Sequence, residues 1–248
     1  HADMTHGHIK KFYLRRWFRT LPLYYFLLII FIILTTITTQ KLDLHLFHFV
    51  FLQNFLPLDF FSISWSLAIE EWFYFLTPII LFFSYKLRFL TKKTVYLLLL
   101  IVLGVIALRM LYVVFFNPSF DEVRKHVFFR FDSLIIGVLL AGVKLHMNGL
   151  YKKLQKPLIA GVAFVTLAFV AYEFMRYYAE ISLNPPFFVN VFALPMVSVI
   201  IALMIPFFET NALVNTKIAA ITLFRSFIIW TSLLSYSLYL IHLSMFDL

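Results

Sequence analysis

Residues 64–78, SWSLAIEEWFYFLTP, form the stretch on which the fold of this chain depends. The stretch is apolar enough to enter a bilayer, yet it carries two adjacent carboxylates, Glu70 and Glu71. A carboxylate inside a membrane costs about 2.5–3.5 kcal/mol on insertion scales, so it usually has a partner and a function. One polar stripe at helical spacing is formed by Ser66, Glu70, Tyr74 and Thr77. We therefore expect a transmembrane helix with a functional polar face. The alternative is a helix end at the headgroups, with both acids in water.

The composition is that of an integral membrane protein. Of the 248 residues, 62% are hydrophobic and 13% are charged, and the mean hydropathy is +0.92. A soluble domain has about 45–50% apolar and about 25% charged residues. Apolar runs of about 20 residues recur, which favours an all-α, polytopic transmembrane helix bundle over a β-barrel. The chain has no cysteine, which excludes disulfides, thiolate metal sites and a cysteine nucleophile. No carboxylate cluster accompanies His1, His6 and His8, so we expect no metal site there.

Seven segments are long and apolar enough to cross a bilayer. They are residues 20–39, 64–85, 94–116, 126–145, 157–175, 187–208 and 226–246. Residues 44–56 are apolar but only about 13 residues long, so we expect a short re-entrant or interfacial helix there. We also expect a cytoplasmic basic segment over residues 1–19 and a single transmembrane domain over residues 20–248.

The distribution of basic residues predicts the orientation of the chain. Of the 21 Lys and Arg residues, 15 fall on one side of the predicted spans, 4 on the other side and 2 inside spans. Cytoplasmic loops carry the excess of Lys and Arg, so we expect residue 1 in the cytoplasm and residue 248 outside. The net charge of +9 then reflects topology and contact with anionic lipids of the bilayer, and we expect no nucleic-acid partner.

This orientation brings polar residues of three helices to a similar depth. The helix of residues 64–85 enters from outside, so Glu70 lies about 9 Å inside that boundary. The helix of residues 126–145 enters from the same side and places Arg130 and Asp132 at a similar depth. The outer half of the last helix carries Tyr236, Tyr239 and His242.

We expect Glu70 to face the protein interior and to contact Arg130. Neither has an opposite charge one turn away on its own helix, and an unpaired charge in low dielectric costs several kcal/mol. Arg130 and Asp132 are about 200° apart around a helix, so they cannot face each other. Glu71 lies about 100° from Glu70 and is expected nearer solvent, headgroups or a different partner. The alternative to a functional site is a buried ion-pair network that only fixes helix register.

Three arginines, Arg15, Arg16 and Arg19, stand just before the first span. Arg16 and Arg19 are three residues apart and share a helix face. Guanidinium groups in this arrangement clamp phosphates through bidentate hydrogen bonds. The alternative is a plain positive-inside anchor.

Four motifs occur in order along the chain and fit the predicted topology. They are residues 12–22 (FYLRRWFRTLP), 65–74 (WSLAIEEWFY), 129–137 (FRFDSLIIG) and 235–242 (SYSLYLIH). They resemble the F-Y-x-R-R-x-x-R-x-x-P, W-S-L-x-x-E-x-x-F-Y, R-x-D-x-x-x-x-G and S-Y-x-x-Y-L-x-H motifs of the membrane acyltransferase family 3. Together they cover residues 12–242.

The resemblance implies a ten-helix enzyme of the bacterial inner (cytoplasmic) membrane. Such an enzyme moves an acyl group, commonly acetyl, from cytoplasmic acyl-CoA to a hydroxyl of a glycan or glycolipid on the far side, and it holds no permanent cofactor. The seven spans correspond to the third to ninth helices, so we expect two helices at the start and one at the end to be lacking. In the family, a helix ahead of the basic motif carries the histidine assigned to catalysis.

The resemblance and the depth argument give the candidate residues their roles. The catalytic candidates are Glu70, Arg130 and Asp132. The donor-binding candidates are Arg15, Arg16 and Arg19. The acceptor-binding candidates are Trp65, Ser66, Tyr74, Tyr236, Tyr239 and His242.

Two other functions are compatible with charges inside the membrane. A polytopic transporter or flippase for a lipid-linked sugar would use them along a substrate pathway, although the sequence shows no internal repeat or pair of broken helices. A purely structural membrane subunit would need no substrate. Transfer of an acyl group distinguishes the enzyme from both.

Overall fold

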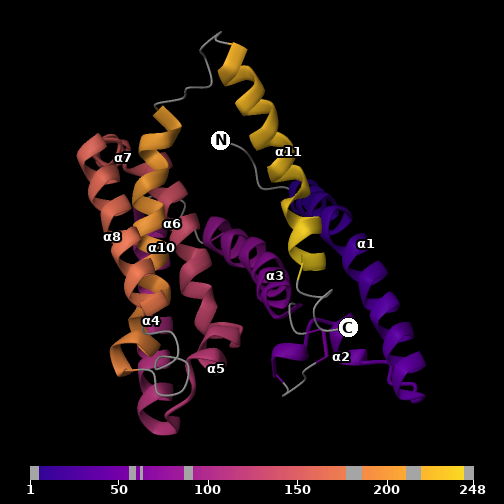
Figure 1. Cartoon of the computed structure of the whole chain (residues 1–248). Coiled ribbons are helices and arrows are strands. Elements are labelled where there is room, and N and C mark those ends of the chain that lie inside the picture. The colour runs from indigo at the N-terminus through magenta and orange to yellow at the C-terminus, as the bar shows by residue number, and fades with distance from the viewer. Residues whose placement is uncertain are drawn as a thin grey trace. The chain divides into compact units, whose positions relative to one another are not determined.

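The computed structural model describes residues 6–55, 60–61, 64–86, 92–176, 186–210 and 219–242 (Figure 1). Helices account for most of these residues and no strand occurs among them, which confirms the all-α fold. The long helices are α1 (His6–Thr39), α3 (Ser64–Lys86), α4 (Lys92–Phe116), α6 (Phe131–His146), α8 (Pro157–Arg176), α10 (Phe187–Thr210) and α11 (Ala219–His242). The short helical segments are α2 (Leu46–Phe49), η1 (Gln53–Phe55), α5 (Phe120–Lys125), η2 (Phe128–Arg130) and α7 (Asn148–Leu154). Each predicted span therefore corresponds to one long helix.

Four helices among the described residues are long and apolar enough to cross a membrane: α1, α4, α8 and α10. Many of their large apolar side chains are exposed on the surface of the protein. Phe116 and Leu158, for example, are 71% and 76% exposed. In water such surfaces would aggregate, whereas in lipid they are the normal exterior. The protein is thus a multi-pass membrane protein. The count of seven crossings stays a prediction.

The helix predicted over residues 126–145 begins later than expected, at Phe131. The preceding residues form the separate helix α5, where Ser119 Oγ accepts a hydrogen bond from the backbone N–H of Glu122, and then the 3-10 turn η2. The turn η2 takes up residues 128–130 of the predicted span, and its tighter 3-10 geometry is the reason that the α-helix starts only at Phe131. With 16 residues, α6 is shorter than the roughly 20 that a straight crossing needs.

The chain divides into two compact units, residues 80–212 and residues 1–79 with 213–248. In the first of these, α4, α6, α8 and α10 lie side by side (Figure 1). The short helix α7 is fixed to α10 because the Tyr151 hydroxyl donates to Glu209, which also pairs with Lys144. Burial, together with Glu209, raises the pKa of Tyr151 to about 12, so the phenol remains a donor at physiological pH.

The other unit is built on α1, which runs without a break through the expected boundary at residue 19. Its core contains Tyr24, Leu28 and Leu67, with Leu240 contributed by α11. Contacts between α1 and α3 run in opposite order along the two helices. The Tyr13 hydroxyl donates to the carbonyl of Phe75, whereas further along α1 the partner of Thr20 is Glu71. The two helices therefore pass each other in opposite directions.

Between α1 and α3 the chain returns along α1. The Tyr24 hydroxyl donates to the carbonyl of His48 at 2.9 Å, and the Tyr25 hydroxyl donates to the carbonyl of Phe49 at 3.0 Å. These tyrosines precede the end of α1 at Thr39 by about 15 residues, or about 22 Å of helix. The short segment therefore folds back along α1, which is the arrangement expected of a re-entrant helix.

Positive φ angles mark the turns of this re-entrant segment. They occur at His45, Phe51 and Phe61, with φ of 44°, 58° and 49°. For a bulky residue such as Phe51 this backbone conformation is strained and persists only where surrounding contacts fix it. One such contact is the bond of 2.9 Å from Trp72 Nε1 to the carbonyl of Phe51.

We predict that Tyr24→Phe destabilises the protein more than Tyr25→Phe. The Tyr24 bond is buried, so its loss leaves the His48 carbonyl without that donor and costs about 1–3 kcal/mol, whereas the half-buried Tyr25 bond is worth about 1 kcal/mol or less. Thermal unfolding of both variants in the same detergent measures the difference. Equal, small shifts would show that the segment does not dock on α1 through these hydroxyls.

Candidate functional site

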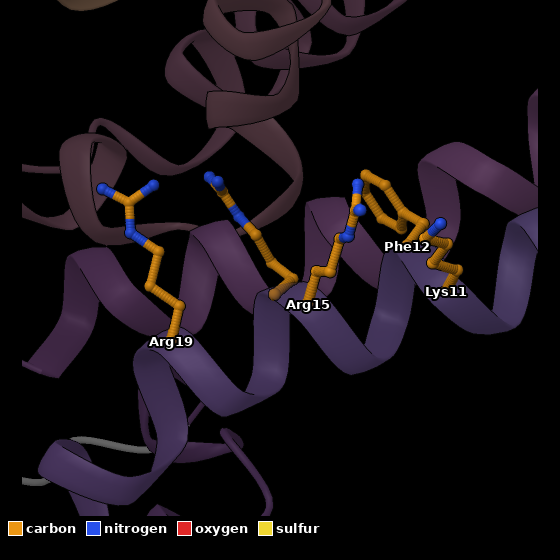
Figure 2. Close-up of a pocket in the computed structure, with 5 residues that line it drawn as sticks. Lys11, Phe12, Arg15 and Arg19 are labelled. Carbon is orange, nitrogen blue, oxygen red and sulfur yellow. The ribbon is translucent and has the colours of Figure 1, made fainter.

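A pocket of about 460 Å³ lies on the basic end of α1. Its lining residues are Lys11, Phe12, Arg15, Arg16 and Arg19. Their spacing of three and four residues places them on one helix face, and Figure 2 shows the labelled side chains projecting from the same side of the ribbon. We call this the arginine pocket. It brings the three predicted donor-binding residues together and adds two that the sequence did not single out, Lys11 and Phe12.

The cations of this pocket have free binding capacity. Among the residues that the structure describes, neither Lys11 nor any of the three arginines forms an ion pair. The guanidinium of Arg16 lies over the ring of Tyr74, with Cζ at 3.8 Å from the ring centroid, and its Nε has no hydrogen-bond partner among the described atoms. An aromatic ring positions a guanidinium without using up its N–H donors. The pocket is therefore suited to an anion with several oxygens.

Glu70 lies at the basic end of α1, which corrects its expected position near the outer end of the first span. Arg16 and Arg19 are the cations that act on it electrostatically, and the Tyr74 hydroxyl donates to Glu70 Oε2 at 3.3 Å. The re-entrant segment is the physical reason, because it returns the chain along α1 before α3 begins. The sequence indicated this return of the chain, because residues 44–56 are too few to cross a bilayer. The predicted contact with Arg130 joins the two units and stays a prediction.

Glu71 is buried, with 6% of its surface exposed, so of the three environments expected for it the structure has the different partner and not solvent. Its different partner is Thr20, whose hydroxyl donates to Glu71 Oε1 at 2.8 Å. Glu71 also lines a second pocket of about 380 Å³, whose other walls are apolar or aromatic. Those walls include Trp17, Leu21, Tyr25, Phe49, Val50, Phe51, Trp72 and Phe75. The two adjacent carboxylates thus have separate environments.

Two of the predicted acceptor-binding residues meet at the start of α3. Ser66 Oγ and the Tyr239 hydroxyl of α11 are hydrogen-bonded at 2.5 Å. Trp65 receives a bond from Asn54 Nδ2 at its carbonyl, so its main chain fixes the re-entrant segment. Tyr74, a third candidate, belongs to the arginine end instead. The side chains of Tyr236 and His242 lie outside the described part of the chain.

The predicted polar stripe of α3 therefore connects two polar contacts. Ser66, Glu70 and Tyr74 follow one another at intervals of four residues, so they lie on one face over about 12 Å. At one end Tyr74 supports Arg16, and at the other Ser66 meets Tyr239. Glu70 stands between them, bonded to Tyr74. This arrangement offers cations for an anionic ligand at one end and hydroxyl groups at the other.

In the unit of residues 80–212, Asp132 pairs with Arg109, a residue that the sequence did not single out. Both side chains are fully buried, and Arg109 donates to Asp132 Oδ2 at 2.7 Å. Arg109 also donates to the carbonyls of Phe129 and Val191, which connects α4, α6 and α10. The other oxygen, Asp132 Oδ1, accepts from the backbone N–H of Ser133 at 2.6 Å. Asp132 of α6 thus has its counter-ion on another helix, α4.

Arg130 ends the turn η2 and is partly buried. Asp132 attracts its guanidinium, while Arg109 and Arg124 repel it. The 3-10 geometry of residues 128–130 differs from the continuous α-helix on which the 200° separation of Arg130 and Asp132 was based.

The fold and the site together define a multi-pass helical membrane protein with a basic pocket on α1 and a carboxylate, Glu70, close to it. The model of the acyltransferase 3 family, an acyltransferase domain, matches residues 5–248. The chain belongs to this family and is an acyltransferase for groups other than amino-acyl groups, as its four motifs predicted. No curated protein and no solved structure matches the chain.

We predict that Asp132→Asn destabilises the fold far more than Asp121→Asn. Removing the charge of Asp132 leaves Arg109 buried without its counter-ion, which costs about 3–5 kcal/mol. Asp121 pairs with Arg124 and Lys125 at the surface, where such a loss costs about 1 kcal/mol or less. Thermal unfolding in detergent compares the two variants. A stable but inactive Asp132→Asn variant would instead favour the catalytic role that we expected for Asp132.

Proposed function

We propose that this acyltransferase moves an acyl group, most simply acetyl, from cytoplasmic acyl-CoA to a hydroxyl of a glycan or glycolipid on the outer side of the membrane. The observation that carries the proposal is the stripe of Ser66, Glu70 and Tyr74, which leads from the arginine pocket to Tyr239. Donor and acceptor need separate sites that share one reaction centre, and the stripe supplies a route of about 12 Å between two such ends.

The arginine pocket is the donor site in this proposal. Acyl-CoA carries its negative charge on phosphates, and Arg15, Arg16 and Arg19 are cations on one face that form no ion pair within the described part of the chain. Guanidinium groups bind phosphate oxygens in pairs of parallel hydrogen bonds. The thioester arm then extends from the phosphates toward Glu70.

The reaction at the thioester follows ordinary acyl-transfer chemistry. The acceptor oxygen forms a bond to the carbonyl carbon, the carbon–sulfur bond breaks, and the hydroxyl proton passes through a base to the leaving thiolate. The family resemblance assigns the base to a histidine ahead of the basic motif. We propose that Glu70 accepts a hydrogen bond from the acceptor hydroxyl and orients it, and Arg130 stays the basic group that we propose for catalysis. Asp132, whose oxygens are engaged, acts in this proposal as a positioning residue.

Several polar side chains of α3 and α11 are proposed to bind the acceptor. They are Trp65, Ser66, Tyr74, Tyr236, Tyr239 and His242. We place the protein in the bacterial inner membrane with residue 1 in the cytoplasm and residue 248 outside, because the basic loops require that orientation and acyl-CoA is cytoplasmic. The alternative function, in which no reaction is catalysed, is that of a flippase for a lipid-linked sugar. Family membership favours acyl transfer over it.

Inverted membrane vesicles supplied with labelled acetyl-CoA test this function. We expect labelled glycan or glycolipid in the parent protein, none in Glu70→Gln, and a milder loss in Glu71→Gln. Glu70→Gln removes the negative charge on which Arg16 and Arg19 act, whereas the role of Glu71 is the bond from Thr20, which an amide at position 71 still accepts. Movement of glycan without any acyl transfer would overturn the enzyme assignment and favour the flippase.

Arg16→Lys is expected to weaken donor binding about tenfold. An ammonium keeps the charge but cannot reproduce the bidentate fork or the planar contact with Tyr74. Topology should not change, because the positive charge is retained. Titration with coenzyme A measures the affinity, with Arg124→Lys in the other unit as the matched control. Affinity equal to that of the parent would return Arg16 to the role of a membrane anchor.

A further inference from the structure

We propose that the arginine pocket binds the nucleotide end of coenzyme A in one fixed direction, with Phe12 stacked on the adenine base and Lys11 at the 3′-phosphate. The inference rests on the proposed function, since it takes acyl-CoA as the donor. It deepens the site by two residues, both of which line the pocket beside the arginines.

The charge of the pocket calls for a polyanion. Lys11, Arg15 and Arg19 repeat every four residues along α1, so like charges lie one above another, and Arg16 adds a fourth. Like charges at this spacing destabilise a helix unless a ligand compensates them. Coenzyme A carries about −2 on its 3′-phosphate monoester and about −2 on its diphosphate. Four cations and about four negative charges therefore match.

The order of the residues gives the direction. From Lys11 to Arg19 the row extends about 12 Å along the helix. Phe12 lies at one end of the row, and Glu70 lies at the other, close enough to Arg16 and Arg19 for electrostatic interaction. In coenzyme A the base, the phosphorylated ribose, the diphosphate and the thioester arm follow one another. Only the direction with the base at Phe12 carries the thioester toward Glu70.

Phe12 is suited to hold a base rather than to fill a core. Its side chain is 40% exposed and forms part of the pocket wall. It meets Tyr74 edge to face, with ring centroids 6.4 Å apart and planes at 70°. Together with a second edge contact, to Tyr13 at 5.8 Å and 74°, this contact holds the ring at the pocket wall, and aromatic faces of this kind stack on bases. A lipid phosphate headgroup, the other source of phosphate at a basic helix end, gains nothing from such a face.

The test uses the full chain in nanodiscs of zwitterionic lipid, titrated with coenzyme A and with 3′-dephospho-coenzyme A. We expect Lys11→Gln to weaken coenzyme A about tenfold and to leave the dephospho compound within about twofold. Phe12→Leu should weaken both compounds about tenfold. Lys10→Gln and Phe18→Leu are the matched controls, because Lys10 and Phe18 are exposed on the same helix and do not line the pocket.

Three outcomes would overturn the inference while coenzyme A still binds the parent. In the first, Lys11→Gln weakens the binding of both compounds equally. In the second, Phe12→Leu has the same affinity for coenzyme A as Phe18→Leu. In the third, anionic lipid in the nanodisc displaces coenzyme A with no dependence on Phe12, which would identify a headgroup site. Failure of the parent chain to bind coenzyme A at all is a separate result, and it would contradict the proposed function itself.

Discussion

The docking of the re-entrant segment on α1 is the constraint on which this site depends. Backbone carbonyls inside a bilayer have no water to bond, so irregular chain is tolerated there only where protein groups satisfy it. The hydroxyls of Tyr24 and Tyr25 and the indole of Trp72 do so for the carbonyls of His48, Phe49 and Phe51. Because these donors lie far from the C-terminal end of α1 at Thr39, the segment carries the chain back before α3 starts.

That return determines which side chains meet. If α3 started beside the C-terminal end of α1, Glu70 would lie far from the arginines at the other end of that helix. Since α3 instead starts part-way back along α1, the ring of Tyr74 lies under the guanidinium of Arg16, and Glu70 lies one turn away on the same stripe. A pocket for an anion and an intramembrane carboxylate, which appear as separate features in the sequence, become neighbours. The proposed path of the acyl group is correspondingly short.

The sequence predicts the helices well because continuous apolar runs have a single good solution in lipid. All seven long helices were found in this way, and the family followed from four motifs. The position of Glu70 relative to α1 was not predictable by counting residues from Ser64, because that count assumes that α3 begins level with the end of α1. The burial of Glu71 was missed for a similar reason, since its partner Thr20 is 51 positions away in the chain. Arg109 is a lone cation inside an apolar span, which is itself a signal in the sequence. The residues around it in the sequence did not indicate Asp132 as its partner.

Glu70 and Glu71 show why adjacent carboxylates need not share a role. A step of 100° around a helix is enough to place one beside the arginine end and the other in an apolar pocket. Glu71 is buried and bonded at 2.8 Å to a hydroxyl of α1, so its position is fixed by the packing of two helices. Glu70 has one long bond of 3.3 Å, from Tyr74 on its own helix, and two attracting cations that form no ion pair with it. A carboxylate that acts on a substrate must keep acceptor capacity that the fold does not consume. By that criterion Glu70 is the carboxylate that the proposed reaction would use, and Glu71 belongs to the packing of α1 against α3.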